Sequence, residues 1–104
     1  MTNPHAMLED ELLRKVRAMC EERGLLVNHV EDARLGRVWQ RGMPDLEIFG
    51  RVNVHAELKR EDDDLSPDQK RIRHAIIRGG GRFYIWKPSH LLDGTIAREL
   101  DKIS

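Results

Sequence analysis

Residues 42–60 read GMPDLEIFGRVNVHAELKR, and this stretch decides the expected fold. It contains two runs with strand-like alternation, at 45–49 and 52–59. In the second run Val, Val, Ala and Leu alternate with Asn, His, Glu and Lys, so one face is apolar and the other polar. Such period-two alternation indicates a half-buried strand. Gly50 and Arg51 between the runs suit a tight antiparallel turn, and the stretch therefore predicts a β-hairpin.

This hairpin would bring three polar side chains together. Alternate residues of a strand project to the same face, so Glu57 and Lys59 emerge side by side. Asp45 stands at the start of the other strand, directly after Pro44, which pre-sets the backbone. Two carboxylates and an amine at one point can hold a divalent cation and a polarised water, and that arrangement can hydrolyse a phosphodiester. Taken singly, Asp45 fits a turn and the Glu57–Lys59 pair fits a surface ion pair, so the hypothesis depends on their convergence.

The rest of the chain supplies the layers around this hairpin. The apolar spacing predicts a helix over 5–23, a strand over 25–30, a helix over 67–78, a strand over 82–86 and a helix over 91–103. Residues 31–42 fit either a loop or an extension of a strand through Val38 and Trp39. A strand–helix–strand crossover from 52 to 86 implies one parallel pair, while the hairpin is antiparallel. We therefore expect an α+β fold with helices packed on a mixed sheet.

Bulk composition bounds the protein class. With 104 residues, 35% of them charged and 39% hydrophobic, the chain suits a single soluble globular domain over 1–104. No apolar run approaches the ~20 residues that span a bilayer, and charged residues near the N-terminus do not fit a signal peptide. A lone cysteine, Cys20, favours a reducing, cytoplasmic setting. The formal net charge of zero counts mildly against a non-specific nucleic-acid binder.

Several motifs in order resemble one nuclease family. The sequence has PD at 44–45, ELK at 57–59, LSPDQ at 65–69, a following helix, a glycine pause and the strand FYIW at 83–86. In order and spacing this resembles the VRR-NUC branch of the PD-(D/E)XK nuclease superfamily over nearly the whole chain. The resemblance implies a restriction-endonuclease-like core in the order helix, three strands, helix, strand, helix. It also implies a small stand-alone member of the kind found in bacteriophages, acting in the cytoplasm of a bacterial or phage-infected host cell.

The resemblance assigns roles to the residues that match it. It implies that Asp45, Glu57 and the backbone carbonyl of Leu58 are metal ligands. Lys59 would orient or deprotonate the attacking water, and Gln69 would brace the site. The hard oxygen ligands favour Mg²⁺ or Mn²⁺. Gln69 also fits the third position of a capping box begun by Ser66, and both roles for this residue stay open.

An acid on the first helix usually completes the site in this branch. Glu9 shares the helix face of Leu12, Leu13 and Val16 and is our choice, with Glu11 in reserve.

His55 lies on the strand face of Glu57 and fits either a metal or phosphate contact or, more simply, a polar neighbour. The other histidines show no ligand spacing with one another, and they are His5, His29, His74 and His90.

Cations flank the proposed site on both sides. We expect contacts to nucleic acid from Arg41, Arg60, Lys70 and Arg73. The expected activity is a metal-dependent endodeoxyribonuclease acting on branched or duplex DNA as a homodimer, with selectivity like that of a Holliday-junction resolvase. The alternative is a binding module on the same fold, without turnover.

Overall fold

The computed structural model of this chain describes residues 3–30 and 41–104. Within them the sheet strands are β1 (Leu26–His29), β2 (Leu46–Phe49), β3 (Asn53–Leu58) and β4 (Arg82–Trp86). The helices are the 3₁₀ turn η1 (Pro4–Ala6), α1 (Glu9–Glu22), α2 (Pro67–Arg78), α3 (Pro88–Leu92) and α4 (Thr95–Ile103). The predicted α+β fold with a mixed sheet is confirmed. The loop and strand interpretations of residues 31–42 depend mainly on residues 31–40, including Val38 and Trp39, which lie outside the described residues.

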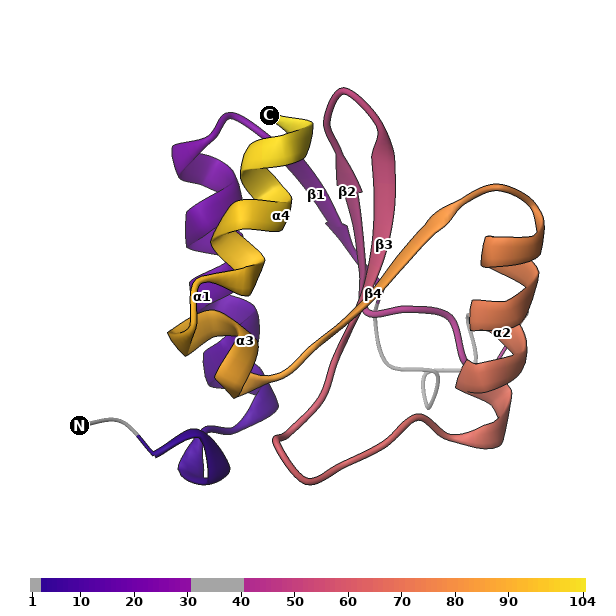
Figure 1. Cartoon of the computed structure of the whole chain (residues 1–104), viewed down its shortest axis with the longest axis horizontal. Coiled ribbons are helices and arrows are strands. Elements are labelled where there is room, and N and C mark those ends of the chain that lie inside the picture. Colours follow the sequence, from indigo (N-terminus) through magenta and orange to yellow (C-terminus); the bar gives the residue numbers. More distant parts are fainter. Residues whose placement is uncertain (1–2, 31–40) are drawn as a thin grey trace.

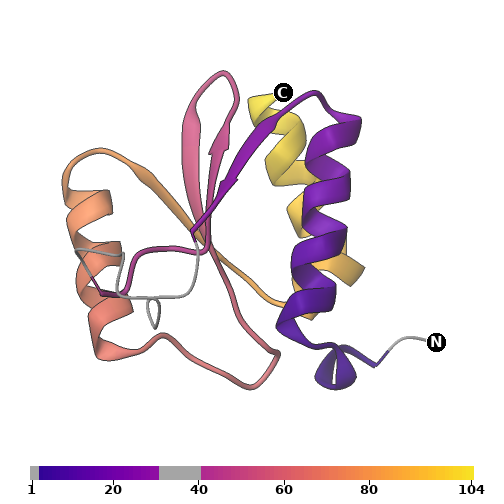
Figure 2. The ribbon, with the colours of Figure 1, turned by 180° about the vertical axis from the view of Figure 1, so that it is seen from behind.

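Helices cover the two sides of the sheet unequally (Figures 1 and 2). α1, α3 and α4 lie together on one side, and α2 stands on the other side next to β4. The buried core joins the sheet to α1 and α4 through Leu46, Ile48, Val54, Ala56, Leu58, Leu12, Val16, Cys20, Ile96, Leu100 and Ile103. No residue of α2 is buried. The main apolar core therefore lies on the α1 and α4 side, and α2 is held by fewer contacts.

The hairpin has the predicted pairing. The strands run in the order β1-β2-β3-β4, with β2 antiparallel to β1 and β3, and β3 parallel to β4. Phe49 pairs with Asn53, so the connection is a three-residue loop over 50–52 rather than the two-residue turn expected from Gly50 and Arg51. The amide of Arg51 donates a hydrogen bond of 2.7 Å to the Ile103 carbonyl, which fixes the loop against the C-terminal end of α4.

The N-terminal helix is shorter than predicted. Instead of one helix over 5–23, η1 ends at Ala6 and α1 begins at Glu9. Between them Met7 is extended and buried, which stops the helical path. Leu8 precedes α1 and is 56% exposed, so it lies outside the buried apolar stripe of this helix. The change of direction puts Glu9 in the first turn of α1.

The C-terminal helix is divided, where a single helix over 91–103 was expected. α3 ends at Leu92 and α4 begins at Thr95, with Gly94 between them in the left-handed region at φ +84°. The Asp93 carboxylate accepts a hydrogen bond from the Thr95 amide at 2.9 Å and starts the new helix. Leu92 is consequently exposed, whereas Ile96, Leu100 and Ile103 of α4 are buried.

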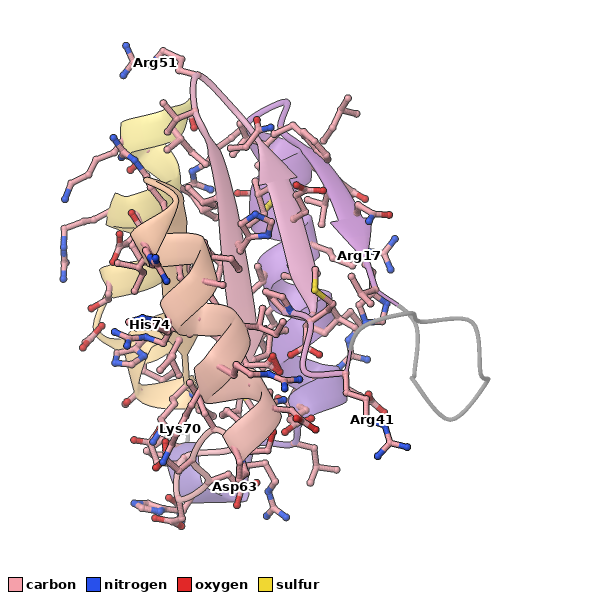
Figure 3. The ribbon with its side chains drawn as sticks, turned by 90° about the vertical axis from the view of Figure 1, so that its right-hand side faces the viewer. Arg17, Arg41, Arg51, Asp63, Lys70 and His74 are labelled. Atoms are coloured by element: carbon pink, nitrogen blue, oxygen red, sulfur yellow. The ribbon has the colours of Figure 1, made fainter. Side chains whose placement is uncertain are left out.

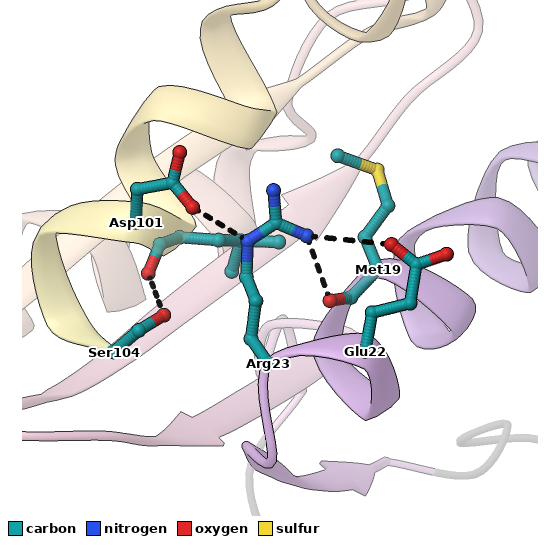
Figure 4. Close-up of polar contacts among 6 residues, drawn as sticks. Met19, Glu22, Arg23, Asp101 and Ser104 are labelled. Carbon is teal, nitrogen blue, oxygen red and sulfur yellow. Dashed lines mark hydrogen bonds and ion pairs between the residues drawn. The ribbon is translucent and has the colours of Figure 1, made fainter.

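Arg23 ties the end of α1 to the end of α4 (Figure 4). Its Nε donates to Asp101 Oδ1 at 2.8 Å, and its Nη1 donates to the Met19 carbonyl at 2.9 Å. Beside this contact Ser104 Oγ donates to the Leu100 carbonyl. The two helices that form the main core layer are thus connected by a charged group at one end.

Two aromatic residues of β4, Tyr84 and Trp86, pack against each other. Tyr84 and Trp86 stack with centroids 5.7 Å apart and planes 10° from parallel. Trp86 is 1% exposed, so its role is core packing, as favoured from the sequence. No helix in the described part of the chain combines the length and apolarity needed to cross a membrane.

Candidate active site

Asp45 and Glu57 are neighbours across the hairpin. Leu46 pairs with Ala56, and one further step of that antiparallel register places Asp45 opposite Glu57. Asp45 Oδ2 accepts a hydrogen bond of 2.8 Å from the Leu58 amide, which fixes the carboxylate beside the end of β3. The predicted convergence of the two carboxylates is therefore present in the structure.

Glu57 is a buried acid with one oxygen bonded and one oxygen unpaired. Only 2% of the residue is exposed. Its Oε1 accepts a hydrogen bond of 3.0 Å from Nε2 of Gln69 in the first turn of α2. Its Oε2 is buried and has no hydrogen-bond partner among the residues that the structure describes. A buried carboxyl oxygen without a donor favours either a protonated acid, here facing Asp45, or a cationic partner beside it.

Gln69 fulfils both of the roles that the sequence left open. Its Oε1 accepts from the Ser66 amide at 2.8 Å, and its own amide donates to Ser66 Oγ at 3.2 Å, which completes the capping box. The remaining side-chain group, Nε2, is then free to face Glu57. Helix capping and bracing of the site use different atoms of one side chain.

The electrostatics of Glu57 show an excess of negative over positive charge at the site. Burial raises the pKa of Glu57 to about 9, and the neighbouring Asp45 carboxylate adds to this increase in pKa. Lys59 lowers the pKa of Glu57, and Glu9 raises it. The charges of Asp45, Glu57, Lys59 and Glu9 thus act on one another, although Glu9 lies on α1 and the other three lie in or next to the hairpin.

Glu9 approaches the site from the start of α1. Partial burial raises its pKa, the nearby Asp45 carboxylate adds to the increase, and Lys59 opposes it. Glu9 is exposed rather than part of the inward stripe, because it occupies the first helical turn. A cavity of about 70 Å³ lies beside it and is lined by Glu9, Asp10, Leu13, His29, Asp45 and Leu58. Glu11 does not line this cavity, and the geometry favours Glu9 over Glu11.

His29 and Asp10 line the cavity although neither was a candidate site residue from the sequence, and His29 is the one next to the Asp45 segment. It is the last residue of β1 and pairs with Leu46, directly after Asp45 in the chain. The Val30 amide, one position further, donates to the Asp45 carbonyl at 2.8 Å. The sequence places His29 near the end of the strand predicted over 25–30. Only the pairing of β1 with β2 shows that this position lies next to Asp45.

The residues present fit a divalent cation. Glu57 Oε2 is buried and unpaired, Asp45 stands beside it, and Leu58 lines the adjoining cavity. Within 3–30 and 41–104, no group of three or more His, Cys, Asp and Glu side chains forms a metal site by itself. The expected donor set of two carboxylates and the Leu58 carbonyl, all of them oxygen ligands, stays a prediction.

His55 does not join this group. Its Nε2 lies 3.9 Å from Glu47 Oε2 on the neighbouring strand. Of the two interpretations left open for His55, this contact favours the polar neighbour.

Two of the four cations expected to contact nucleic acid, Lys70 and Arg73, are on α2, where Figure 3 labels Lys70. Lys70 follows Gln69, is exposed, and has its Nζ 3.6 Å from an Asp64 carboxylate oxygen. Arg73 is exposed, with its guanidinium carbon 6.0 Å from the centre of the Phe83 ring. Arg41 and Arg60 are also exposed; Arg41 precedes the hairpin in the sequence, and Arg60 follows it. Since these side chains lack deep burial, they are available to solvent and to ligands.

Comparison with solved structures identifies the fold. A solved structure described as "VRR_NUC domain" matches with a TM-score of 0.63 and 23% sequence identity, covering 90% of this chain and 90% of that chain. This chain thus has the fold of a VRR_NUC domain, a restriction-endonuclease-like nuclease fold, and the resemblance inferred from the sequence is confirmed at the level of fold. Neither the protein-family scan nor the search of curated proteins finds a match.

Proposed function

We propose that this protein is a metal-dependent nuclease that hydrolyses phosphodiester bonds in DNA. The observation that carries the proposal is the buried, unpaired Oε2 of Glu57 beside Asp45, on a nuclease fold. An acid held this far from water, next to a second acid, keeps its proton to high pH, and a bound cation would favour its ionised form. A pKa shifted this strongly is typical of a functional site.

The chain's own residues divide the work of hydrolysis. Asp45, Glu57 and the Leu58 carbonyl would hold Mg²⁺ or Mn²⁺. When bound, such a cation polarises a phosphoryl oxygen and favours ionisation of a water. Lys59, which influences both Glu57 and Glu9, would orient the attacking water and offset negative charge that develops on the phosphate. Gln69 fixes the orientation of Glu57 by its hydrogen bond.

Substrate binding would use the cations around the site. Lys70 and Arg73 on α2, with Arg41 and Arg60 on either side of the hairpin in the sequence, would contact phosphates that flank the reacting one; their exposure supports this. Contacts of this kind make affinity fall steeply with salt and carry no sequence information.

A substrate panel tests the proposal. Four-way junction, flap, single-stranded and duplex DNA are incubated with the protein at equal concentration, with and without Mn²⁺. We expect cleavage of at least one substrate only when Mn²⁺ or Mg²⁺ is present, and loss of cleavage in Asp45→Asn. Binding of these DNAs without cleavage under any metal condition would instead identify a binding module on a nuclease fold.

Junction selectivity and a homodimer are further parts of the proposal. Symmetric cutting of a junction needs two active sites, and one small domain has limited surface for embracing a duplex. Light scattering coupled to gel filtration, alone and with a four-way junction, measures whether one or two copies bind. A strictly monomeric protein that cuts the flap faster than the junction would remove this part of the proposal.

A further inference from the structure

Gly42 makes an unusually close backbone contact with the start of α2. It adopts φ +86°, and a Cβ atom built on it would lie 2.5 Å from the Asp68 carbonyl carbon, 2.6 Å from the Asp68 oxygen and 2.7 Å from the Gln69 amide nitrogen. All three atoms belong to the backbone, so a side chain cannot move aside to relieve the overlap. Normal contacts between carbon atoms lie near ~3.5–4.0 Å, and only glycine permits this approach.

The contact connects the two halves of the candidate site. On one side, Gly42 precedes Asp45 by Met43 and the buried Pro44, a short and stiff connection. On the other side, it touches Gln69, whose side chain bonds Glu57. A displacement at Gly42 would therefore pass to Asp45 through the chain, or to Glu57 through Gln69.

Apart from the Gln69–Glu57 hydrogen bond, α2 has few other contacts among the described residues that fix its first turn. None of its residues is buried, and within the described residues its main neighbour in the sheet is β4. The capping box orders the first turn internally, but it does not attach that turn to the strand carrying Asp45. Backbone contact at Gly42 makes this attachment.

We propose that Gly42 is a positioning residue that seats the first turn of α2 and so sets the distance between Gln69, Glu57 and Asp45. The inference rests on the proposed function only in its catalytic consequence; the seating itself is a property of the fold. A methyl group at position 42 would push the helix start away by roughly 1 Å, a misplacement that can cost about 100-fold in rate.

The test compares Gly42→Ala with Gly80→Ala. Gly80 has φ +84°, follows the opposite end of α2, and would place a Cβ with nothing within 4 Å. Both variants carry the same backbone strain, and only Gly42→Ala adds the overlap. Three readouts are measured on each folded variant: the Gln69 side-chain amide resonance, Mn²⁺ affinity by calorimetry, and kcat and KM for the substrate that the wild type cuts. The chain has two glutamines, Gln40 and Gln69, and the spectrum of Gln69→Glu assigns the signal.

In Gly42→Ala we expect the Gln69 amide signal to move toward its solvent value, Mn²⁺ affinity to fall about 10-fold, and kcat to fall about 100-fold with KM nearly unchanged. Gly80→Ala should stay within about 2-fold of the wild type in all three, as expected for strain without overlap. Equal behaviour of the two variants would overturn the inference. If the wild type binds Mn²⁺ yet cuts no DNA, the proposed function fails while the first two readouts still decide the role of Gly42.

A second variant covers the case in which Gly42→Ala does not fold. Gly42→Asn keeps the overlap but lowers the cost of positive φ, since asparagine tolerates the left-handed region better than alanine. We expect the same loss of Mn²⁺ affinity. If both variants at 42 fail to fold while Gly80→Ala folds, the contact is a requirement of the whole domain, and a specific positioning role is refuted.

Discussion

Gln69 Nε2 donates a hydrogen bond of 3.0 Å to Glu57 Oε1, joining the first turn of α2 to a buried acid at the end of the hairpin. The same glutamine completes the capping box with Ser66. This double use explains how a helix without buried residues is aligned with a buried site. It also allows the two functions to be separated by mutation.

Gln69→Glu retains the capping acceptor and replaces the amide donor with a second carboxylate facing Glu57. Capping boxes accept Glu and Gln alike, so the helix start should survive. Loss of the hydrogen bond from the amide and the partial burial of a second acid should lower the free energy of unfolding at pH 7 by about 1–3 kcal/mol without metal. Urea denaturation measures the change. Ser66→Ala, which removes only the cap, should cost about 1 kcal/mol. A Gln69→Glu protein as stable as the wild type would show that the contact with Glu57 carries no weight.

The pKa of Glu57 predicts how stability depends on pH. Burial and Asp45 raise this pKa from an ordinary 4.5 to about 9. Between those values the folded protein keeps a proton that the unfolded chain has lost. Stability is therefore fully present below about pH 4.5 and declines as pH rises toward 9, by at most about 1.4 kcal/mol per pH unit.

Urea denaturation of the metal-free protein between pH 5.5 and 8.5 tests this dependence. Glu57→Gln has no proton to lose and should show a flatter profile. Its remaining slope would include His5, whose pKa is raised by its hydrogen bond with Asp62. Saturating Mn²⁺ should flatten the wild-type profile in the same way, because the cation favours the carboxylate. Parallel profiles for wild type and Glu57→Gln would contradict the prediction.

Lys59→Ala should separate catalysis from metal binding. Removing the amine takes away the group that faces both acids, and a general acid–base or charge-stabilising role is worth about 10²–10⁴ in kcat. Mn²⁺ affinity measured by calorimetry should change only a few-fold. Lys15→Ala, an exposed lysine of α1, serves as the control and should cut at the wild-type rate. Full activity in Lys59→Ala would exclude the residue from the reaction.

Arg73→Ala should weaken DNA binding in a salt-dependent manner. Arg73 is exposed on α2 and is proposed to contact a phosphate, so its loss should reduce the slope of log K against log salt by about 1. Fluorescence anisotropy at several salt concentrations, without divalent metal, gives the slope. Arg98→Ala removes an exposed arginine on α4, across the sheet from α2, and should leave the slope unchanged. Equal slopes for Arg73→Ala and Arg98→Ala would show that Arg73 does not contact a DNA phosphate.

Arg23→Ala should destabilise the fold without changing the site. Arg23 is 20% exposed at its side chain and bonds both Asp101 and the Met19 carbonyl. We expect a loss of about 1–2 kcal/mol in the free energy of unfolding, measured with urea. The coupling to Asp101, measured by a double-mutant cycle, should be at most about 1 kcal/mol because Asp101 is largely exposed. Arg14→Ala, on the exposed side of the same helix, should stay within about 0.5 kcal/mol of the wild type.

Local sequence signals were sufficient for most of the elements. Ser66, Pro67 and Gln69 predicted the start of α2, and alternation predicted β3 and its pairing with β2. The misses were at breaks inside helical patterns. Burial of Met7 ended the first helical path early, and the left-handed turn at Gly94 divided the last helix, both of which depend on contacts or backbone angles that apolar spacing does not record.

The chain's own order of residues determined which groups could meet, because strand alternation and one short loop put Asp45, Glu57 and Lys59 within reach of each other. Tertiary structure alone decided the environment in which they meet. It buried Glu57, aimed Gln69 at it from α2, brought Glu9 from the N-terminal helix and lined a small cavity in part with His29. The reason is that desolvation and long-range charge arise only when distant segments exclude water together, and no local pattern encodes that exclusion.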